Sequence, residues 1–240
     1  MNTENSRRDT LKFGIYSSLS LTILTVITFG FAMTAIPPSG PYCPDNCMNY
    51  PFPDILSYYP RDYYWMYLAI FQLFAYIIFV VTNHFIAPLE KRMYSFISIA
   101  FALISTTVLL IAYFTQFSVI PISVMKGETD GIALLTQYNG HGIFIALEEL
   151  GYIAMSISFL FLAPVFSFNS RIEKSIRIIL IIQFVLTLFS FISYAIKFGL
   201  DRSYRFEVST ITINWVLIIV IGILTSLYLK KLLNKIELKN

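Results

Sequence analysis

The chain has few charged side chains, and this shortage excludes most classes of soluble protein. Lys, Arg, Asp and Glu together make up 13% of its 240 residues, whereas about 25% is typical of a soluble domain. Apolar side chains make up 57%, and the mean hydropathy is +0.70. A soluble fold of this length needs polar groups to cover its surface. We therefore expect an integral membrane protein.

The low net charge and the lack of metal-binding motifs exclude further classes of function. The net charge of +3 is too small to indicate nucleic-acid binding, and disorder would need low hydrophobicity and high net charge. The chain has two histidines and no His-Glu-x-x-His motif, so we expect no His-rich metal site and no cofactor. His84 is interpreted as an interfacial side chain. A carboxylate-rich site for Ca²⁺ or Na⁺ stays open.

Six apolar runs are long enough to cross the roughly 30 Å of bilayer hydrocarbon as helices. They cover residues 13–35, 63–88, 93–119, 141–167, 178–196 and 208–229. The first run follows a basic lead-in but is longer than the apolar part of a signal peptide, so we expect a retained helix. The fold class predicted is an all-α polytopic membrane protein, residues 1–240 forming one six-helix domain.

The basic residues sort by side of the membrane. Lys and Arg accumulate on the cytoplasmic side of membrane proteins, and 12 of the 17 fall on one side. These are Arg7, Arg8, Lys12, Lys91, Arg92, Arg171, Lys174, Arg177, Lys230, Lys231, Lys235 and Lys239. The other five are Arg61, Lys126, Lys197, Arg202 and Arg205. The split predicts a multi-pass protein of the plasma or inner membrane with both termini cytoplasmic.

The first outer loop, residues 37–62, holds both cysteines, Cys43 and Cys47. A lone pair in a non-cytoplasmic loop is typical of a structural disulfide. A membrane thiol oxidoreductase is the alternative, although its usual motif is Cys-x-x-Cys. Aromatic residues cluster around the start of the second run and predict an interfacial belt: Tyr58, Tyr59, Tyr63, Tyr64, Trp65 and Tyr67.

The sequence of the second outer loop, residues 120–140, predicts a short helix on the outer surface. Thr129 is expected to cap it, and Asn139-Gly140 to end it. Its Leu side is expected to face the membrane. Glycines on both sides leave hinges, so the segment is either a simple connector or a lid.

The fourth run carries two adjacent acids, Glu148 and Glu149. Counted from the start of the run, they lie about 10–12 Å along the helix. A charge there costs on the order of 2.5–3.5 kcal/mol, so it normally faces a protein interior, a partner or a water-filled cavity. Adjacent residues point about 100° apart, so the two acids cannot share one narrow face. This is the strongest sign of a site in the sequence.

The doublet resembles that of the CAAX-type intramembrane proteases, but Ile153 stands where their motif has a basic residue and the chain lacks their further His-bearing helices. Rhomboid-type proteases also have six helices, but their Gly-x-Ser-Gly nucleophile motif is absent. Nor are the runs broken by Gly and Pro as in many transporters. We assign no family.

Other polar residues fall in the outer third of the runs or near it, and we expect them to form a layer with the acid pair. They are Gln72, Tyr113, Gln116, Tyr152, Tyr194, Lys197, Asn214 and Trp215, with His141 at the mouth.

Three functions remain open. In the first, the layer is an outward-facing pocket that binds a small ligand, lipid headgroup or cation for transport or sensing. In the second, the protein is an enzyme that uses Glu148 or Glu149 as acid or base on a lipid, with His141 assisting. In the third, the layer only holds the helices of a structural or accessory subunit together. The partners expected are the lipid bilayer and a small ligand or lipid; the oligomeric state is left undetermined.

Overall fold

A computed structural model describes residues 3–35 and 37–238. The described part is helical and has no strand, and six of its helices are long and apolar enough to cross a membrane. These are α1 (Thr3–Ala32), α2 (Tyr64–Ile86), α3 (Arg92–Ser118), α6 (Ile143–Leu162), α7 (Arg171–Phe198) and α8 (Tyr204–Glu237). The expected all-helical fold with six helices of membrane-spanning length is therefore confirmed. Lys239, counted among the basic residues above, lies outside the described residues.

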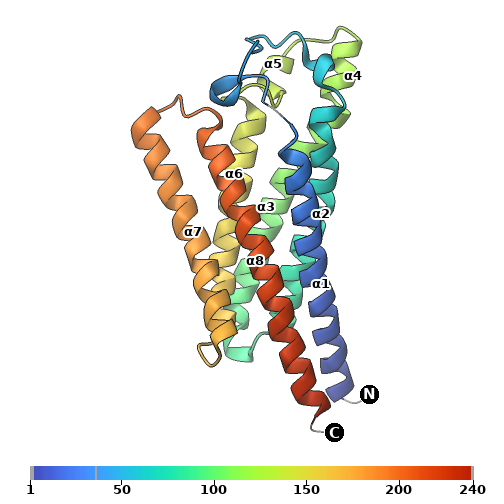
Figure 1. The fold of residues 1–240 in the computed structure, drawn as a ribbon, viewed down its shortest axis with the longest axis vertical. Coiled ribbons are helices and arrows are strands. Elements are labelled where there is room, and N and C mark those ends of the chain that lie inside the picture. The colour runs from blue at the N-terminus through green and yellow to red at the C-terminus, as the bar shows by residue number, and fades with distance from the viewer. Residues whose placement is uncertain (1–2, 36, 239–240) are drawn as a thin grey trace.

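The shorter elements lie between the long helices. They are the helices α4 (Ile120–Met125) and α5 (Ile132–Leu135) and the 3-10 helices η1 (Gly40–Tyr42), η2 (Ile55–Tyr58), η3 (Arg61–Tyr63), η4 (Leu89–Lys91) and η5 (Ala163–Val165). Both chain ends lie at the same end of the bundle, and α4, α5 and the cysteine loop lie at the opposite end (Figure 1). We call the latter the disulfide end and the former the terminal end.

The first and last helices are neighbours. α1 packs against α8 and α2, α3 against α2 and α6, and α7 against α8 and α6 at the edge of the bundle (Figure 1). Gly222 allows the close approach of α8 to α1, because a Cβ there would collide with the side chain of Thr22 and lie 2.9 Å from the Ser18 carbonyl oxygen. Small residues at helix crossings are typical of membrane bundles.

Three helices begin several residues earlier than the apolar runs indicate: α1, which begins at Thr3, α7 and α8. α7 begins at Arg171 because Ser170 caps it: the Ser170 hydroxyl accepts a hydrogen bond from the Glu173 N–H and donates one to the Glu173 carboxylate. Ser170 and Glu173 have the Ser-x-x-Glu spacing of a capping box, but the Glu173 carboxylate accepts from the Ser170 hydroxyl and not from the Ser170 backbone N–H. α8 begins at Tyr204, which brings Glu207 into its first turn. An acid there is favoured by the helix dipole.

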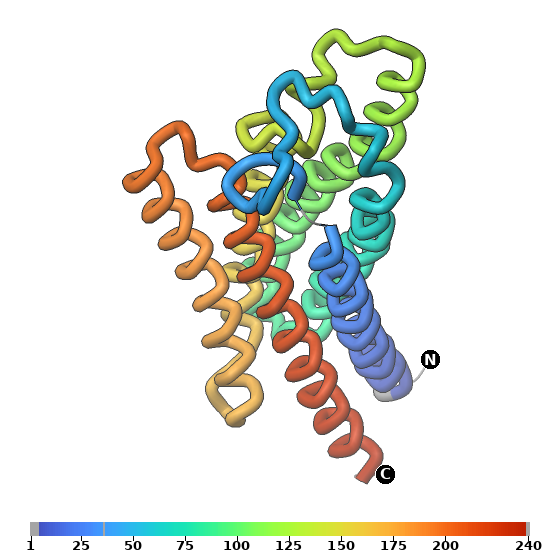
Figure 2. Tube along the Cα trace, turned by 45° about the horizontal axis from the view of Figure 1, so that its top comes forward, coloured from blue at the N-terminus to red at the C-terminus, as the bar shows by residue number. Residues whose placement is uncertain are grey.

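The two loops at the disulfide end pack on each other (Figure 2). Met48, Phe52 and Ile55 from the first form a small apolar cluster with Ile132 and Tyr138 from the second. Cys43 and Cys47 form the expected disulfide. The cluster is a second core outside the bundle.

The short helix in the second loop differs from the expectation. It is preceded by Gly131 at a φ of 79°, with no side-chain cap, so Thr129 does not cap it. It ends at Leu135, and its buried residue is Ile132 whereas Leu134 is exposed. The predicted cap, end and Leu-down orientation were therefore wrong.

Candidate functional site

Glu148 is an acidic side chain buried inside the helix bundle. It follows the start of α6 by five residues, or about 7.5 Å along the axis, a smaller depth than the apolar run indicated. Its exposed fraction is 0%. Neither carboxylate oxygen has a hydrogen-bond partner in the part of the chain that the structure describes. An unpartnered buried acid costs free energy, so its presence needs an explanation.

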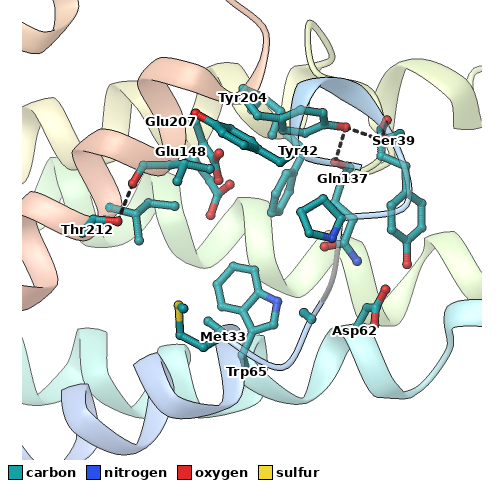
Figure 3. Close-up of a pocket in the computed structure, with 18 of the residues that line it drawn as sticks. Met33, Ser39, Tyr42, Asp62, Trp65, Gln137, Glu148, Tyr204, Glu207 and Thr212 are labelled. Atoms are coloured by element: carbon teal, nitrogen blue, oxygen red, sulfur yellow. Dashed lines mark hydrogen bonds between the residues drawn. The ribbon is translucent and has the colours of Figure 1, made fainter. Parts of the chain in front are cut away.

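A second acid, Glu207 of α8, lies beside Glu148 (Figure 3). Its exposed fraction is 8%, and its Oε2 has no partner among the described residues. Glu207 was not among the predicted site residues, because the sixth apolar run begins at residue 208. A signal was present: Glu207, Thr210 and Asn214 follow at three and four residues, so they share one helix face.

Glu149 points elsewhere. Arg202, in the connection between α7 and α8, binds it through both oxygens, with Nη2 2.6 Å from Oε2 and Nε 3.1 Å from Oε1. The hydrogen bonds to Glu149 raise the pKa of Arg202. Glu149 thus fixes the segment that leads into α8, and it does not line the cavity described next.

Glu148 and Glu207 both lie in the wall of a cavity of about 400 Å³ near the disulfide end. This volume is in the usual range for small-molecule sites. The walls come from the end of α1, the connection after it, the starts of α2, α6 and α8, and the loop before α6. The lining residues are Phe29, Ala32, Met33, Ala35, Pro37, Pro38, Ser39, Tyr42, Asp62, Trp65, Gln137, Tyr138, Phe144, Ile145, Glu148, Tyr204, Glu207, Val208, Ile211, Thr212 and Trp215.

Both tryptophans of the chain lie in this wall. The ring centroids of Trp65 and Trp215 are 6.1 Å apart, and that of Phe29 is 5.7 Å from Trp215. Trp65 is therefore not part of an interfacial belt, and Tyr63 is fully buried, whereas Tyr59, Tyr64 and Tyr67 are exposed. For the exposed tyrosines the interfacial belt stays a prediction.

A hydrogen-bonded cluster lies in the cavity wall toward the disulfide end. The Ser39 hydroxyl lies 2.6 Å from the Tyr138 carbonyl oxygen and 2.8 Å from the Tyr204 hydroxyl. The Tyr204 hydroxyl lies 3.2 Å from the Gln137 carbonyl oxygen (Figure 3). Burial raises the pKa of Tyr138. The cluster joins the loops of the disulfide end to α8.

Most residues of the predicted polar layer are occupied by contacts between helices. Gln72 donates to Thr25 at 3.1 Å, Gln183 donates to Asn214 at 2.7 Å, and the hydroxyls of Tyr113 and Tyr152 are 2.9 Å apart. None of these residues lines the cavity.

Gln116 holds the second loop. Its Nε2 donates to the Leu135 carbonyl oxygen at 2.6 Å, and its Oε1 accepts from the Gln137 N–H at 2.8 Å. Both bonds tie the loop to α3.

The remaining predicted residues lie apart from the cavity. Tyr194 accepts a hydrogen bond from Ser209 at 3.1 Å, and Lys197 and His141 are exposed. His84 is paired with Ser95 at 2.8 Å, between α2 and α3. Within residues 3–35 and 37–238, no group of three or more His, Cys, Asp and Glu side chains is placed to hold a metal ion. Of the predicted set, Glu148 and Trp215 come together at the cavity.

Comparisons with protein-family models, with curated protein sequences and with solved structures find no match to this chain. The six helices that are long and apolar enough to cross a membrane suggest a multi-pass membrane protein.

Proposed function

We propose that this protein lies in the plasma or inner membrane with both termini cytoplasmic, and that it binds a small ligand in the cavity between α1, α2, α6 and α8 for transport or sensing. One observation carries the proposal: Glu148 is fully buried, without a partner among the described residues, in the wall of a ligand-sized cavity and beside a second acid. Intramembrane acids are costly and commonly functional. A binding site that is retained although it lowers the stability of the protein would explain why this unfavourable burial persists.

The basic residues support the orientation. Their excess lies in the helix ends and connections of the terminal end, whereas residues of the opposite, disulfide-bonded end line the cavity. A disulfide persists in an oxidising compartment, and the excess of Lys and Arg favours a cytoplasmic terminal end. Both features support a position of the cavity near the non-cytoplasmic surface.

The structural or accessory alternative is supported by the rest of the polar layer. Gln72 with Thr25 and Gln183 with Asn214 form interhelical hydrogen bonds, which contribute roughly 0.6 kcal/mol each. This explanation does not extend to Glu148, which forms no such bond. The lipid-enzyme alternative has less support, because His141 is exposed and does not line the cavity.

Native mass spectrometry of the purified protein tests the proposal. We expect a small molecule to co-purify with the wild type and to be lost in Glu148→Gln, while the melting temperature is unchanged or higher. Glu128→Gln, at an exposed acid in the second loop, is the control and should retain the molecule. If the wild type carries no small molecule and binds none of the probes named below, the polar layer is structural and the proposal is wrong.

A further inference from the structure

The cavity has an unbalanced set of charges. Three carboxyl groups line it, those of Asp62, Glu148 and Glu207, and none of the described lining residues is Lys, Arg or His. Asp62 is compensated, since the Arg61 Nε lies 2.6 Å from its Oδ1. The two glutamates are not. Two adjacent carboxylates in an apolar wall repel each other, so the pair is neutralised by a proton or by a cation.

The wall facing these acids suits a cation with an apolar body. Trp65 lies across the cavity from the carboxyl groups of Glu148 and Glu207 (Figure 3), and Trp215 and Phe29 extend the aromatic surface. Aromatic faces attract organic cations, Trp most strongly. Most other lining side chains are apolar, such as Phe144, Ile145 and Ile211. An anionic group such as phosphate would be repelled by the same acids.

The cavity reaches the outside of the bundle between α1 and α8. Three of its lining residues are exposed there: Met33 (73%), Val208 (39%) and Thr212. Met33 directly follows α1, and the other two lie in the first turns of α8. In a membrane these positions face lipid near one bilayer surface. A ligand with an apolar body can therefore enter from the lipid side.

We infer that the ligand is an organic cation with an apolar body and that it takes the place of a proton on the Glu148–Glu207 pair. This inference rests on the proposed function, because it names the ligand class of the same cavity. On binding, the proton leaves the carboxyl pair for the solvent and the positive charge of the ligand replaces it. Binding therefore weakens as the pH falls.

Other titratable side chains near the Glu148–Glu207 pair come from α3, α6, α8 and the first loop. They are Tyr113 of α3, Glu149 and Tyr152 of α6, Tyr204 of α8, and Tyr42 and Asp62 of the first loop. Glu149 and Asp62 each have an arginine partner. The tyrosines are neutral near pH 7, so the glutamate pair is the group that exchanges the proton.

Two probes of equal shape separate charge from apolar contact. Benzyltrimethylammonium is a cation, and neopentylbenzene is its neutral counterpart with carbon in place of nitrogen. Because both tryptophans line the cavity, intrinsic fluorescence of the full-length protein reports occupancy directly. In one detergent, we expect the cation to bind at least tenfold more tightly than the neutral probe. Its dissociation constant should rise by up to tenfold for each unit decrease in pH.

Glu207→Gln should weaken cation binding at least tenfold while leaving the binding of neopentylbenzene unaffected, and replacing both Glu148 and Glu207 by Gln should remove the pH dependence. Glu128→Gln is the control and should behave as the wild type. Equal binding of both probes by the wild type would refute the inference but keep the proposed function. Cation binding without pH dependence would refute proton exchange. These wild-type results stand even if Glu207→Gln fails to fold. Binding of neither probe, with no co-purifying molecule, would overturn the proposed function as well.

Discussion

Arg202 binds both carboxylate oxygens of Glu149, whereas the adjacent Glu148 binds no described group and faces the cavity. Two acids that are neighbours in sequence thus have different environments. Glu149 is 6% exposed and joins α6 to the connection before α8. Glu148 instead has Glu207 beside it. Opposite responses to the same substitution follow.

Glu149→Gln should lower stability, and Glu148→Gln should preserve or raise it. The first change leaves the Arg202 guanidinium without its carboxylate. Because Arg202 is partly exposed, we expect a loss of about 1–3 kcal/mol, less than for a fully buried pair. The second change removes a carboxylate from an apolar wall, with a gain of up to about 1 kcal/mol. Thermal unfolding in detergent measures both. A change of the same sign in both variants would contradict this assignment.

A double-mutant cycle isolates the Glu149–Arg202 pair. Arg202→Gln alone should destabilise the protein about as much as Glu149→Gln, and the double variant should lose less than the sum of the two. The expected coupling is about 0.5–3 kcal/mol, as for residues in direct contact. Lys197→Gln, at an exposed basic residue of the same end, is the control and should change the melting temperature little. Additive losses would show that the pair does not interact.

Two glycines should differ sharply in their tolerance of a side chain. Gly222→Val would place atoms against Thr22 and the Ser18 carbonyl, forcing α1 and α8 apart at a cost of about 1–3 kcal/mol. Gly30→Ala meets nothing within 4 Å, so it should be neutral or stabilising by up to about 1 kcal/mol through helix propensity. Thermal unfolding of both variants in one detergent provides the comparison. Equal losses would mean that α1 and α8 are not in close contact.

Single cysteines should report the orientation of the bundle in intact cells. Lys126→Cys and Leu200→Cys, both exposed at the disulfide end, should react with an impermeant maleimide added outside. Lys174→Cys and Lys235→Cys, exposed at the terminal end, should react only after permeabilisation. The reverse pattern would invert the proposed topology.

The native cysteines should be oxidised in protein prepared without reductant. Alkylation under denaturing, non-reducing conditions should add no mass, and alkylation after reduction should add two labels, because Cys43 and Cys47 are paired. Replacing both by Ser should cost up to about 2 kcal/mol, through the closure of a short loop. Two reactive thiols in the unreduced protein would remove the disulfide and weaken the case for an oxidising compartment at this end.

The six helices, the disulfide and the acid inside α6 could be predicted from the sequence, because long apolar runs, a lone cysteine pair and a charge inside such a run are local signals. The starts of α1, α7 and α8 were predicted too late, since the first turns of these helices consist of polar residues outside the apolar runs; Ser170 caps α7, and Glu207 lies in the first turn of α8.

Which acid faces the cavity depends on the tertiary structure. Glu207 follows Glu148 by 59 residues and Arg202 follows Glu149 by 53, and their meeting depends on how α6 and α8 are rotated and packed. Hydropathy predicts that a helix is buried, whereas the rotation of the helix against its neighbours is set by contacts between side chains far apart in the chain. Such contacts also place Trp65 in the cavity wall.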